Sequence, residues 1–449
     1  MSSKTKKPAD EWLAEKMSGQ VDFEERRLGP GDEFHVQYMR TLTNSDIIFR
    51  FIVTPSYEMG DVQAFKNYIA SFPGTVQPKD MEQLMEYVLK GYVVITIESE
   101  CYLFEAVKTE TSGIGEAINE AIVQGPRDAL SENIELNINL IRRRYQSSAL
   151  KIEMLTVGNV SKTTVAILYD ADRVDRQVLD EMREKIGGVK VDILQSAGEL
   201  EKYITTQKFR VFPTMVVTER PDRVVFNIAE GKVAVLMNTT GFAILAPTIF
   251  TDFFTAMDDK IQVPLVGWFL KVIRYIGLFM TLTLPGFYVT FASYNPEILK
   301  VQISLLIAGS RAAVPYPSFM EVFLMLLMME FLTEASLRLP KAIGPTATTV
   351  GGLILGQAAT QAGLVSNIMI ILVSAVAISN FIIPLSMMGY TVRVIKYIIV
   401  LFAITFGLVG MVVSVVGLIL YLSGIRSFGR PYLKMTVLET KSKGERRNG

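Results

Sequence analysis

Acidic side chains inside an apolar stretch are the residues of this sequence best placed to do chemistry. Most of residues 310–341 is apolar enough to lie in a bilayer, yet the stretch carries Glu321, Glu330, Glu334 and Arg338. Ionisable groups are costly in hydrocarbon, so they usually face a bundle interior or a water-filled path. On a helix, Glu330, Glu334 and Arg338 stand at i, i+4 and i+8 and share one face. We therefore predict the inward side of a membrane helix, lining an ion path or a subunit contact.

A purely structural interpretation stays open beside this one. Arg338 stands one turn from Glu334 and would neutralise it in a buried pair that only packs helices together. Glu321 has no basic residue one turn away, although Arg311 would reach it across the bend at 315–317. Glu321 is therefore the stronger candidate for an ion path.

Composition excludes several classes of function. One histidine (His35) and one cysteine (Cys101) leave almost nothing for a histidine-based triad or a multi-histidine metal site, so we expect no enzyme, metal or cofactor. The formal net charge of zero provides no strong electrostatic attraction to nucleic acid. Cys101 is most simply a small buried residue, with a redox switch as the alternative. The first 25 residues lack the apolar core of a signal peptide, so the N-terminal half is expected in the cytoplasm.

The C-terminal half is expected to be a membrane domain. Hydrophobic residues make up 50% of the chain and the mean hydropathy is +0.32, too apolar for an ordinary soluble protein of 449 residues. A span needs about 20 apolar residues. We predict a membrane domain of about five helices over residues 247–425, with spans at 268–292, 318–337, two within 342–392, and 397–424, a half-crossing at 301–309, and an interfacial segment at 247–260.

Two small α/β subdomains are expected before the membrane domain. They occupy residues 31–124 and 149–246, after a polar tail at 1–30 that has some helix near 9–18. A basic tail at 426–449 ends the chain. Alternating and helical apolar patterns predict these elements. The predicted strands are 34–40, 45–53, 92–97, 102–107, 150–156, 164–169, 189–194, 214–218, 224–228 and 232–237, and the predicted helices are 60–71, 79–90, 174–186 and 198–205.

A linker helix at 125–148 is expected between the two subdomains. Pro126 would lie near its first turn, where proline is favoured, and three arginines end it, where cations suit the helix dipole. It is either an exposed linker or a strut that docks the subdomains or a neighbouring subunit. The docking candidates are Gln124, Gly125, Pro126, Arg127, Arg142, Arg143 and Arg144.

Charge placement leaves the membrane topology open. With the N-terminal half inside, five crossings place Arg338, Lys341, Arg393 and Lys396 inside, as the positive-inside rule prefers. The same count places the basic 426–449 tail outside, against that rule. Either one segment is re-entrant or the count of five is wrong.

Seven short strings stand in a fixed order along the chain. They are Q-G-P-R-D (124–128), N-L-I-R-R-R (139–144), T-E-R-P-D (218–222), A-P-T-I-F-T-D-F-F (246–254), V-P-Y-P-S-F-M-E (314–321), R-L-P-K-A-I-G (338–344) and G-Q-A-A-T-Q-A-G-L-V-S (356–366). Together they resemble the A subunits of GerA-type spore germinant receptors, of which SpoVAF is a close relative. The resemblance covers roughly residues 120 to 425.

The resemblance implies a multi-pass protein of the spore inner membrane. It implies two partners, a transporter-like B subunit that binds the nutrient and a lipoprotein C subunit, and a homo-oligomeric ring whose helices form a gated cation path. The sequence departs from the family pattern at Asn295, Ala312 and Pro345, so a standard receptor subunit and a SpoVAF-like accessory channel or scaffold both stay open. A secondary transporter or a membrane enzyme is disfavoured. The candidate ion-path residues are Glu321, Glu330, Glu334, Arg338, Arg311, Glu297 and Asn295.

Overall fold

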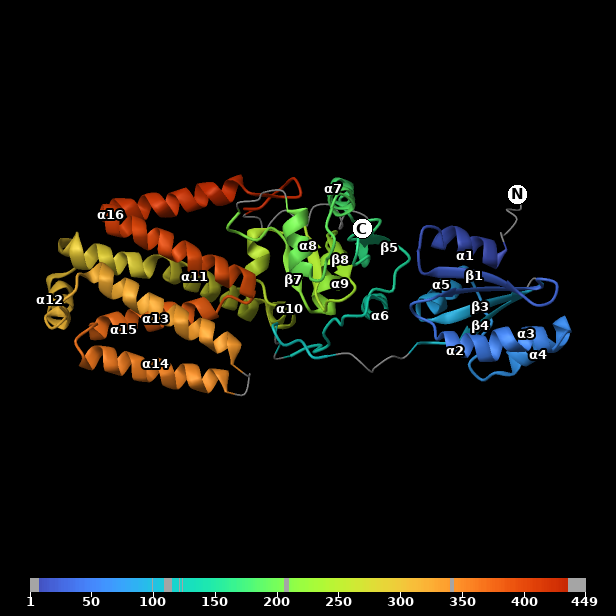
Figure 1. The fold of residues 1–449 in the computed structure, drawn as a ribbon. Helices are drawn as coiled ribbons and strands as arrows, with labels where there is room; N and C mark the ends of the chain where they lie inside the picture. Colours follow the sequence, from blue (N-terminus) through green and yellow to red (C-terminus); the bar gives the residue numbers. More distant parts are fainter. Residues whose placement is uncertain are drawn as a thin grey trace. The chain divides into compact units, whose positions relative to one another are not determined.

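The computed structural model describes residues 8–98, 100–108, 115–120, 122, 124–205, 210–339 and 343–434. They form two compact units (Figure 1). The α/β unit contains the described residues up to 205, together with 214–248 and 427–429. The helical unit contains residues 210–213, 249–426 and 430–434. The predicted order, an α/β region followed by a helical region, is confirmed.

The first half of the α/β unit is a four-stranded antiparallel sheet in the order β1-β2-β3-β4. Strand side chains alternate between its faces, so Val93 and Ile95 enter one core while Val94 enters the other. Phe65 of α4 covers the first face, and Leu13 of α1 covers the second. The strands are β1 (Phe23–Leu28), β2 (Phe34–Met39), β3 (Tyr92–Ile97) and β4 (Glu100–Glu105), and the helices are α1 (Ala9–Met17), α2 (Ser45–Ile48), α3 (Thr54–Glu58), α4 (Val62–Ser71) and α5 (Met81–Leu89).

Residues 45–53, predicted as a strand, are helical, as α2 followed by one π-helical turn. The Asn44 side chain caps α2 by accepting a hydrogen bond from the Asp46 N–H at 2.9 Å. Ile48 and Ile52, four residues apart, are both buried, which is a helical spacing. A short apolar run alone does not distinguish these two outcomes.

The segment predicted as a polar tail contains an ordered strand, β1, which pairs with β2 from Phe23↔Met39 to Leu28↔Phe34. Its sequence is polar because it is an edge strand whose middle residues are exposed.

On β4, burial raises the pKa of the Cys101 thiol to about 12. A thiol that stays protonated is a poor nucleophile, which favours the structural interpretation of this residue over a redox switch.

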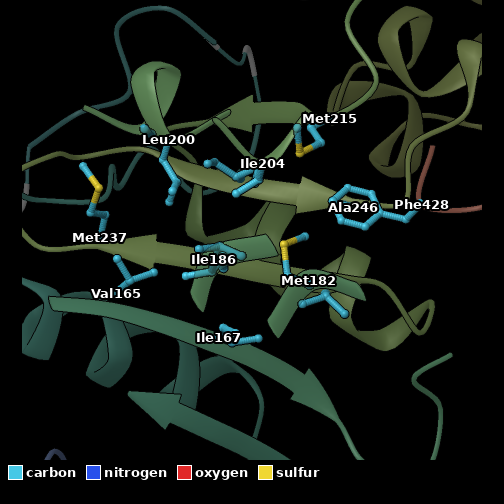
Figure 2. Packing of buried hydrophobic residues seen from close by; sticks show 14 of the residues in the cluster. Val165, Ile167, Met182, Ile186, Leu200, Ile204, Met215, Met237, Ala246 and Phe428 are labelled. Atoms are coloured by element: carbon cyan, nitrogen blue, oxygen red, sulfur yellow. The ribbon is translucent and has the colours of Figure 1, made fainter. Parts of the chain in front are cut away.

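The second half of the α/β unit is a five-stranded antiparallel sheet in the order β5-β6-β8-β9-β7. Helices α7 and α8 supply one core, in which Met182 and Ile186 meet Val165 and Ile167 of β6 (Figure 2). Helices α6 and α9 pack against each other and against β8. The strands are β5 (Leu150–Val157), β6 (Thr163–Asp170), β7 (Val216–Thr218), β8 (Val233–Met237) and β9 (Ala243–Ala246), and the helices are α6 (Ile134–Arg144), α7 (Arg176–Gly187), α8 (Ala197–Ile204) and α9 (Pro221–Ala229).

Two strand predictions in this half are wrong. Residues 224–228 belong to helix α9, which Pro221 opens at a position where proline is favoured. Val224 and Ile228 are both buried, at a helical spacing. Residues 189–194 form no strand. They lie in the connection between α7 and α8, where the carbonyls of Val191 and Asp192 accept hydrogen bonds from the 159–161 turn instead.

The described part of the helical unit contains six longer helices. Two of them, α11 and α16, are long and apolar enough to cross a membrane, and α15 is apolar but has 15 residues. The multi-pass arrangement with about five spans therefore stays a prediction. The helices are α10 (Asp258–Ile261), α11 (Pro264–Ser293), α12 (Val301–Arg311), α13 (Ser318–Arg338), α14 (Gly344–Gln361), α15 (Asn367–Phe381) and α16 (Ser386–Gly424), preceded by a 3-10 turn (Phe250–Phe254).

Helix α16 reverses direction at Gly407, whose φ of 58° and ψ of −139° are not helical. A straight helix of its 39 residues would be about 58 Å long. Instead Thr391 and Tyr421, near its two ends, both hydrogen-bond to the backbone of Val211. Figure 1 shows the two halves as separate red helices that meet near the α16 label. The chain therefore leaves α16 at the end where it entered.

After α16 the chain rejoins the α/β unit. The Ser427 hydroxyl donates to the Thr214 carbonyl at 2.6 Å and accepts from the Thr248 N–H at 3.0 Å. Phe428 enters the core of the second sheet (Figure 2). The rest of the predicted basic tail, after residue 434, lies outside the described residues.

We predict that Gly410→Ala destabilises the α16 reversal. A Cβ at Gly410 would lie 2.1 Å from the Phe402 carbonyl oxygen and 2.7 Å from the Phe406 Cβ, so backbone must move, at a cost of about 1–3 kcal/mol. Gly417→Ala is the matched control, because nothing lies within 4 Å of that position and alanine favours helix. Thermal unfolding in detergent should show a lower midpoint for Gly410→Ala only. Equal midpoints for the two variants would contradict the reversal.

Candidate functional site

Glu321 accepts four hydrogen bonds, and its side chain is fully buried. One carboxylate oxygen accepts from the backbone N–H and the hydroxyl of Ser366, both at 2.6 Å. The other accepts from the Tyr288 hydroxyl at 3.1 Å and from Arg311 Nε at 3.2 Å. These four residues, here called the Glu321 hub, join α11, α12, α13 and the start of α15.

Local sequence explains how the hub assembles. Arg311 ends α12 and reaches Glu321 from across the proline bend, as predicted. Ser366 caps α15 by accepting from the Met369 N–H at 3.2 Å, and a carboxylate beside a helix N-terminus is favoured by the helix dipole. Tyr288 and Ser366 were missed from the sequence because neither carries a charge that marks it. Both oxygens of Glu321 are occupied, so binding a cation there would require the release of a donor.

Glu330 forms a second group with two cations from α16. One carboxylate oxygen accepts from Arg393 Nε at 2.6 Å and the other from Lys396 Nζ at 3.0 Å. The three residues are here called the cationic cluster, and their side chains are 20%, 15% and 5% exposed in the order Glu330, Arg393, Lys396. The sequence had indicated Arg393 and Lys396 only as topology markers.

Glu334 and Arg338 pair at 2.9 Å, as predicted, but the predicted burial of this pair is wrong. Their side chains are 56% and 79% exposed. Each four-residue step along a helix changes the direction of the side chain by about 40°. Glu330 points toward α16, so Glu334 and Arg338, one and two steps later, point progressively away from it. Glu334 is the carboxylate of α13 that its own bundle does not enclose.

Asn295 and Glu297 form a separate exposed pair after α11. Asn295 Nδ2 donates to a Glu297 carboxylate oxygen at 3.0 Å, and this hydrogen bond lowers the pKa of Glu297. Within the described residues, no hydrogen bond or ion pair joins these two side chains to the Glu321 hub. The structure therefore does not bring all seven candidate ion-path residues together.

The predicted docking strut corresponds to α6, which begins later than predicted. Pro126 lies in a non-helical segment, and the helix starts at Ile134, where the Asn133 side chain accepts from the Glu135 N–H at 2.9 Å. Because a side-chain cap satisfies the first free N–H groups, it decides the start of the helix. Gln124, Gly125 and Arg127 are exposed in the same segment.

Buried contacts of α6 favour the strut over an exposed linker. Arg142, 2% exposed, donates to both carboxylate oxygens of Asp22, at 2.7 and 2.6 Å. Asn139 Nδ2 donates to the Thr41 carbonyl at 2.6 Å. These contacts tie the first sheet to the second half of the unit. Arg143 is exposed, and Arg144 pairs with Asp128.

A second network joins the 124–128 and 218–222 strings, which sequence reasoning treated separately. Arg220, 1% exposed, binds the carboxylate of Asp222 and donates to the carbonyls of Glu120 and Pro126 at 3.0 and 3.1 Å. Glu219 accepts from the backbone of residues 119 and 120. Charged strings far apart in sequence therefore hold each other in place.

We predict that Asp22→Asn loosens the strut. It leaves the buried Arg142 without its counter-charge, and breaking one partner of a buried pair costs about 3–5 kcal/mol. Arg143→Gln, on the exposed side of the same helix, is the control and should change stability by less than about 0.5 kcal/mol. Limited proteolysis of the full chain should cut Asp22→Asn faster within residues 9–150. Similar cleavage of the two variants would exclude the strut.

We predict that Glu321→Gln destabilises the helical unit by about 3 kcal/mol or more, because it removes the charge that balances Arg311 in a buried site. Glu334→Gln removes an equal charge from an exposed i,i+4 pair and should cost less than about 1 kcal/mol. The thermal midpoints of the detergent-solubilised variants test this difference. A Glu321→Gln variant as stable as the wild type would show that the hub is not structural.

Comparisons with known proteins agree with the resemblance. The family model described as Bacillus/Clostridium GerA spore germination protein matches residues 11–445. Spore germination protein KA of Bacillus subtilis (strain 168) is 29% identical over 426 residues, covering 93% of this chain and 78% of the relative. Spore germination protein GerQA of Bacillus cereus is 32% identical over 404 residues, covering 89% of this chain and 81% of the relative.

One solved structure is also similar, the N-terminal domain of the A subunit of the Bacillus megaterium spore germinant receptor GerK3. It is 22% identical, with a TM-score of 0.41, and the match covers 54% of this chain and 93% of that chain. Because the family model matches nearly the whole sequence, this chain belongs to the GerA family of spore germination proteins.

Proposed function

We propose that this chain is the membrane subunit of a nutrient-responsive germination receptor, with no enzymatic activity of its own. It acts with a transporter-like B-type subunit and a lipoprotein C-type subunit, and copies of it assemble into a ring that opens a cation path. The observation that carries the proposal is the GerA family match over residues 11–445. The two apolar helices α11 and α16 support its location in the membrane.

The reversal of α16 supports an even number of crossings. Its two halves each have the length of a span, so α16 contributes two crossings where the sequence suggested one. With α11, α13, α14 and α15 the total becomes six, and the chain returns to the side on which it started. Arg426 and Arg430 then lie on the cytoplasmic side, as the positive-inside rule prefers. This arrangement removes the conflict that a count of five creates.

Glu334 is the carboxylate best suited to line a path between subunits. The two oxygens of Glu321 and of Glu330 are already bound to donors within the chain. Glu334 is more than half exposed, and its pair with Arg338 is of the exposed kind that is worth less than about 1 kcal/mol. One such carboxylate per subunit forms a charged collar in a ring, an arrangement that selects cations.

We predict that Glu334→Gln slows nutrient-triggered K⁺ release from spores several-fold, because it removes the charge of the collar. Glu334→Asp keeps the charge and should behave like the wild type. Arg338→Gln breaks the same ion pair while leaving the carboxylate, and should not slow release. Potassium efflux after nutrient addition is the measurement, at matched protein levels.

Two outcomes would count against the proposal in different ways. Equal efflux from all three variants would exclude Glu334 from the cation path while leaving the receptor role intact. A spore that lacks the whole chain yet responds normally to every nutrient would exclude the receptor role itself.

A further inference from the structure

The cationic cluster carries one positive charge more than its partners balance. Glu330 is the one carboxylate within ion-pair distance of Arg393 or Lys396 among the described residues, and it is shared between them. Two cations and one carboxylate leave a net charge of +1 beside side chains that are at most 20% exposed. A partly buried charge without a partner is unfavourable by several kcal/mol, so the cluster favours an added anion.

A hydroxyl also lies beside the cluster. The Tyr397 hydroxyl oxygen is buried and interacts with the Glu330 carboxylate. Lys396 Nζ lies 5.1 Å from the centre of the Tyr397 ring, so the two side chains are neighbours. Because the hydroxyl is neutral, it does not change the net charge of +1.

The position of the cluster along α16 indicates which anion. The Thr391 hydroxyl donates to the carbonyl of Val211 at 2.9 Å. Val211 lies outside the longer helices, so Thr391 marks the end of the helical unit. Arg393 and Lys396 lie only about 3 and 8 Å further along the helix axis. That depth corresponds to the boundary between the lipid headgroups and the hydrocarbon.

The neighbouring surface has the character of that boundary. The Arg393 guanidinium lies over the ring of Tyr390 at 5.6 Å, and Tyr390 is 48% exposed. Tyrosine is enriched at membrane–water interfaces. Val394 and Ile398, on the following turns, are 55% and 43% exposed, as expected of side chains that meet lipid tails.

We propose that the cationic cluster is a binding site for the phosphate headgroup of an anionic phospholipid. Phosphate oxygens accept hydrogen bonds from the Arg393 guanidinium, while Lys396 adds its charge and the acyl chains lie along Val394 and Ile398. Basic pockets between membrane helices on the cytoplasmic side recognise anionic headgroups in this way. The site rests on the membrane placement of the helices in the proposed function, and it does not depend on the cation path.

Two substitutions in the cluster should act in opposite directions. Arg393→Gln leaves Lys396 and Glu330 as a neutral pair, and should weaken phosphatidylglycerol binding about fivefold. Glu330→Gln raises the net charge of the cluster to about +2, and should tighten binding by a similar factor. Lys300→Gln removes one positive charge from an exposed position before α12 and should leave binding unchanged. A purely structural ion cluster would instead weaken with either cluster substitution.

The measurement is the thermal stabilisation of the purified full chain, in phosphatidylcholine micelles, on titration with short-chain phosphatidylglycerol. Inorganic phosphate and added phosphatidylcholine are titrated in parallel. Stabilisation by phosphatidylglycerol alone, with the opposed effects of the two cluster variants, supports the proposal. Lys396→Gln likewise leaves one cation and one carboxylate, and serves where Arg393→Gln fails to fold.

Three outcomes would overturn the proposal. Equal stabilisation by phosphatidylcholine would mean that the site does not recognise the charge of the headgroup. Equal stabilisation by inorganic phosphate would make the site one for a free anion. A change of oligomer size in Arg393→Gln, without a change in lipid preference, would place a carboxylate of a neighbouring copy there. None of these results bears on the receptor role, which is measured in spores.

Discussion

A carboxylate inside an apolar bundle must be neutralised and hydrogen-bonded, and the helical unit is arranged around this requirement. Glu321 draws donors from α11, α12 and the start of α15, so one side chain fixes elements far apart in sequence. Glu330 draws both its partners from α16. Glu321 and Glu330 therefore fix α13 against its neighbouring helices at two positions along its length. Glu334 pairs with Arg338 of its own helix, and among the described residues no ion pair joins it to another helix.

The α/β unit uses the same interaction between its two sheets. Arg142 and Asp22 are both nearly inaccessible to water, and Asp22 also accepts from the Thr41 hydroxyl at 2.6 Å. A buried pair of this kind contributes little net stability compared with apolar packing, but it strongly disfavours other arrangements, because each alternative leaves a charge unpaired. Helix α6 thus holds the two sheets together, although their apolar cores are separate.

Residues 427–429, which follow α16, belong to the α/β unit. Only Ile425 and Arg426 separate the end of α16 from Ser427, which is bonded to Thr214 and Thr248 in the α/β unit. Phe428 follows and is buried in the core of the second sheet.

Apolar patterns were enough to predict α11, α13 and most strands of the two sheets. The spacing of charges predicted the pairings of Arg311 with Glu321 and of Arg338 with Glu334. Strings spread over the chain predicted the family. The remaining features depend on contacts between distant segments. Residues 45–53 and 224–228 are short apolar runs, and only the surface they pack against selects helix over strand. The α16 reversal depends on the approach of Phe402 to Gly410, which no local pattern reports. Which cation neutralises Glu330, and that Glu334 stays exposed, depend on side chains brought together from distant segments. Local periodicity predicts which face is buried, while charge balance is a property of the whole bundle.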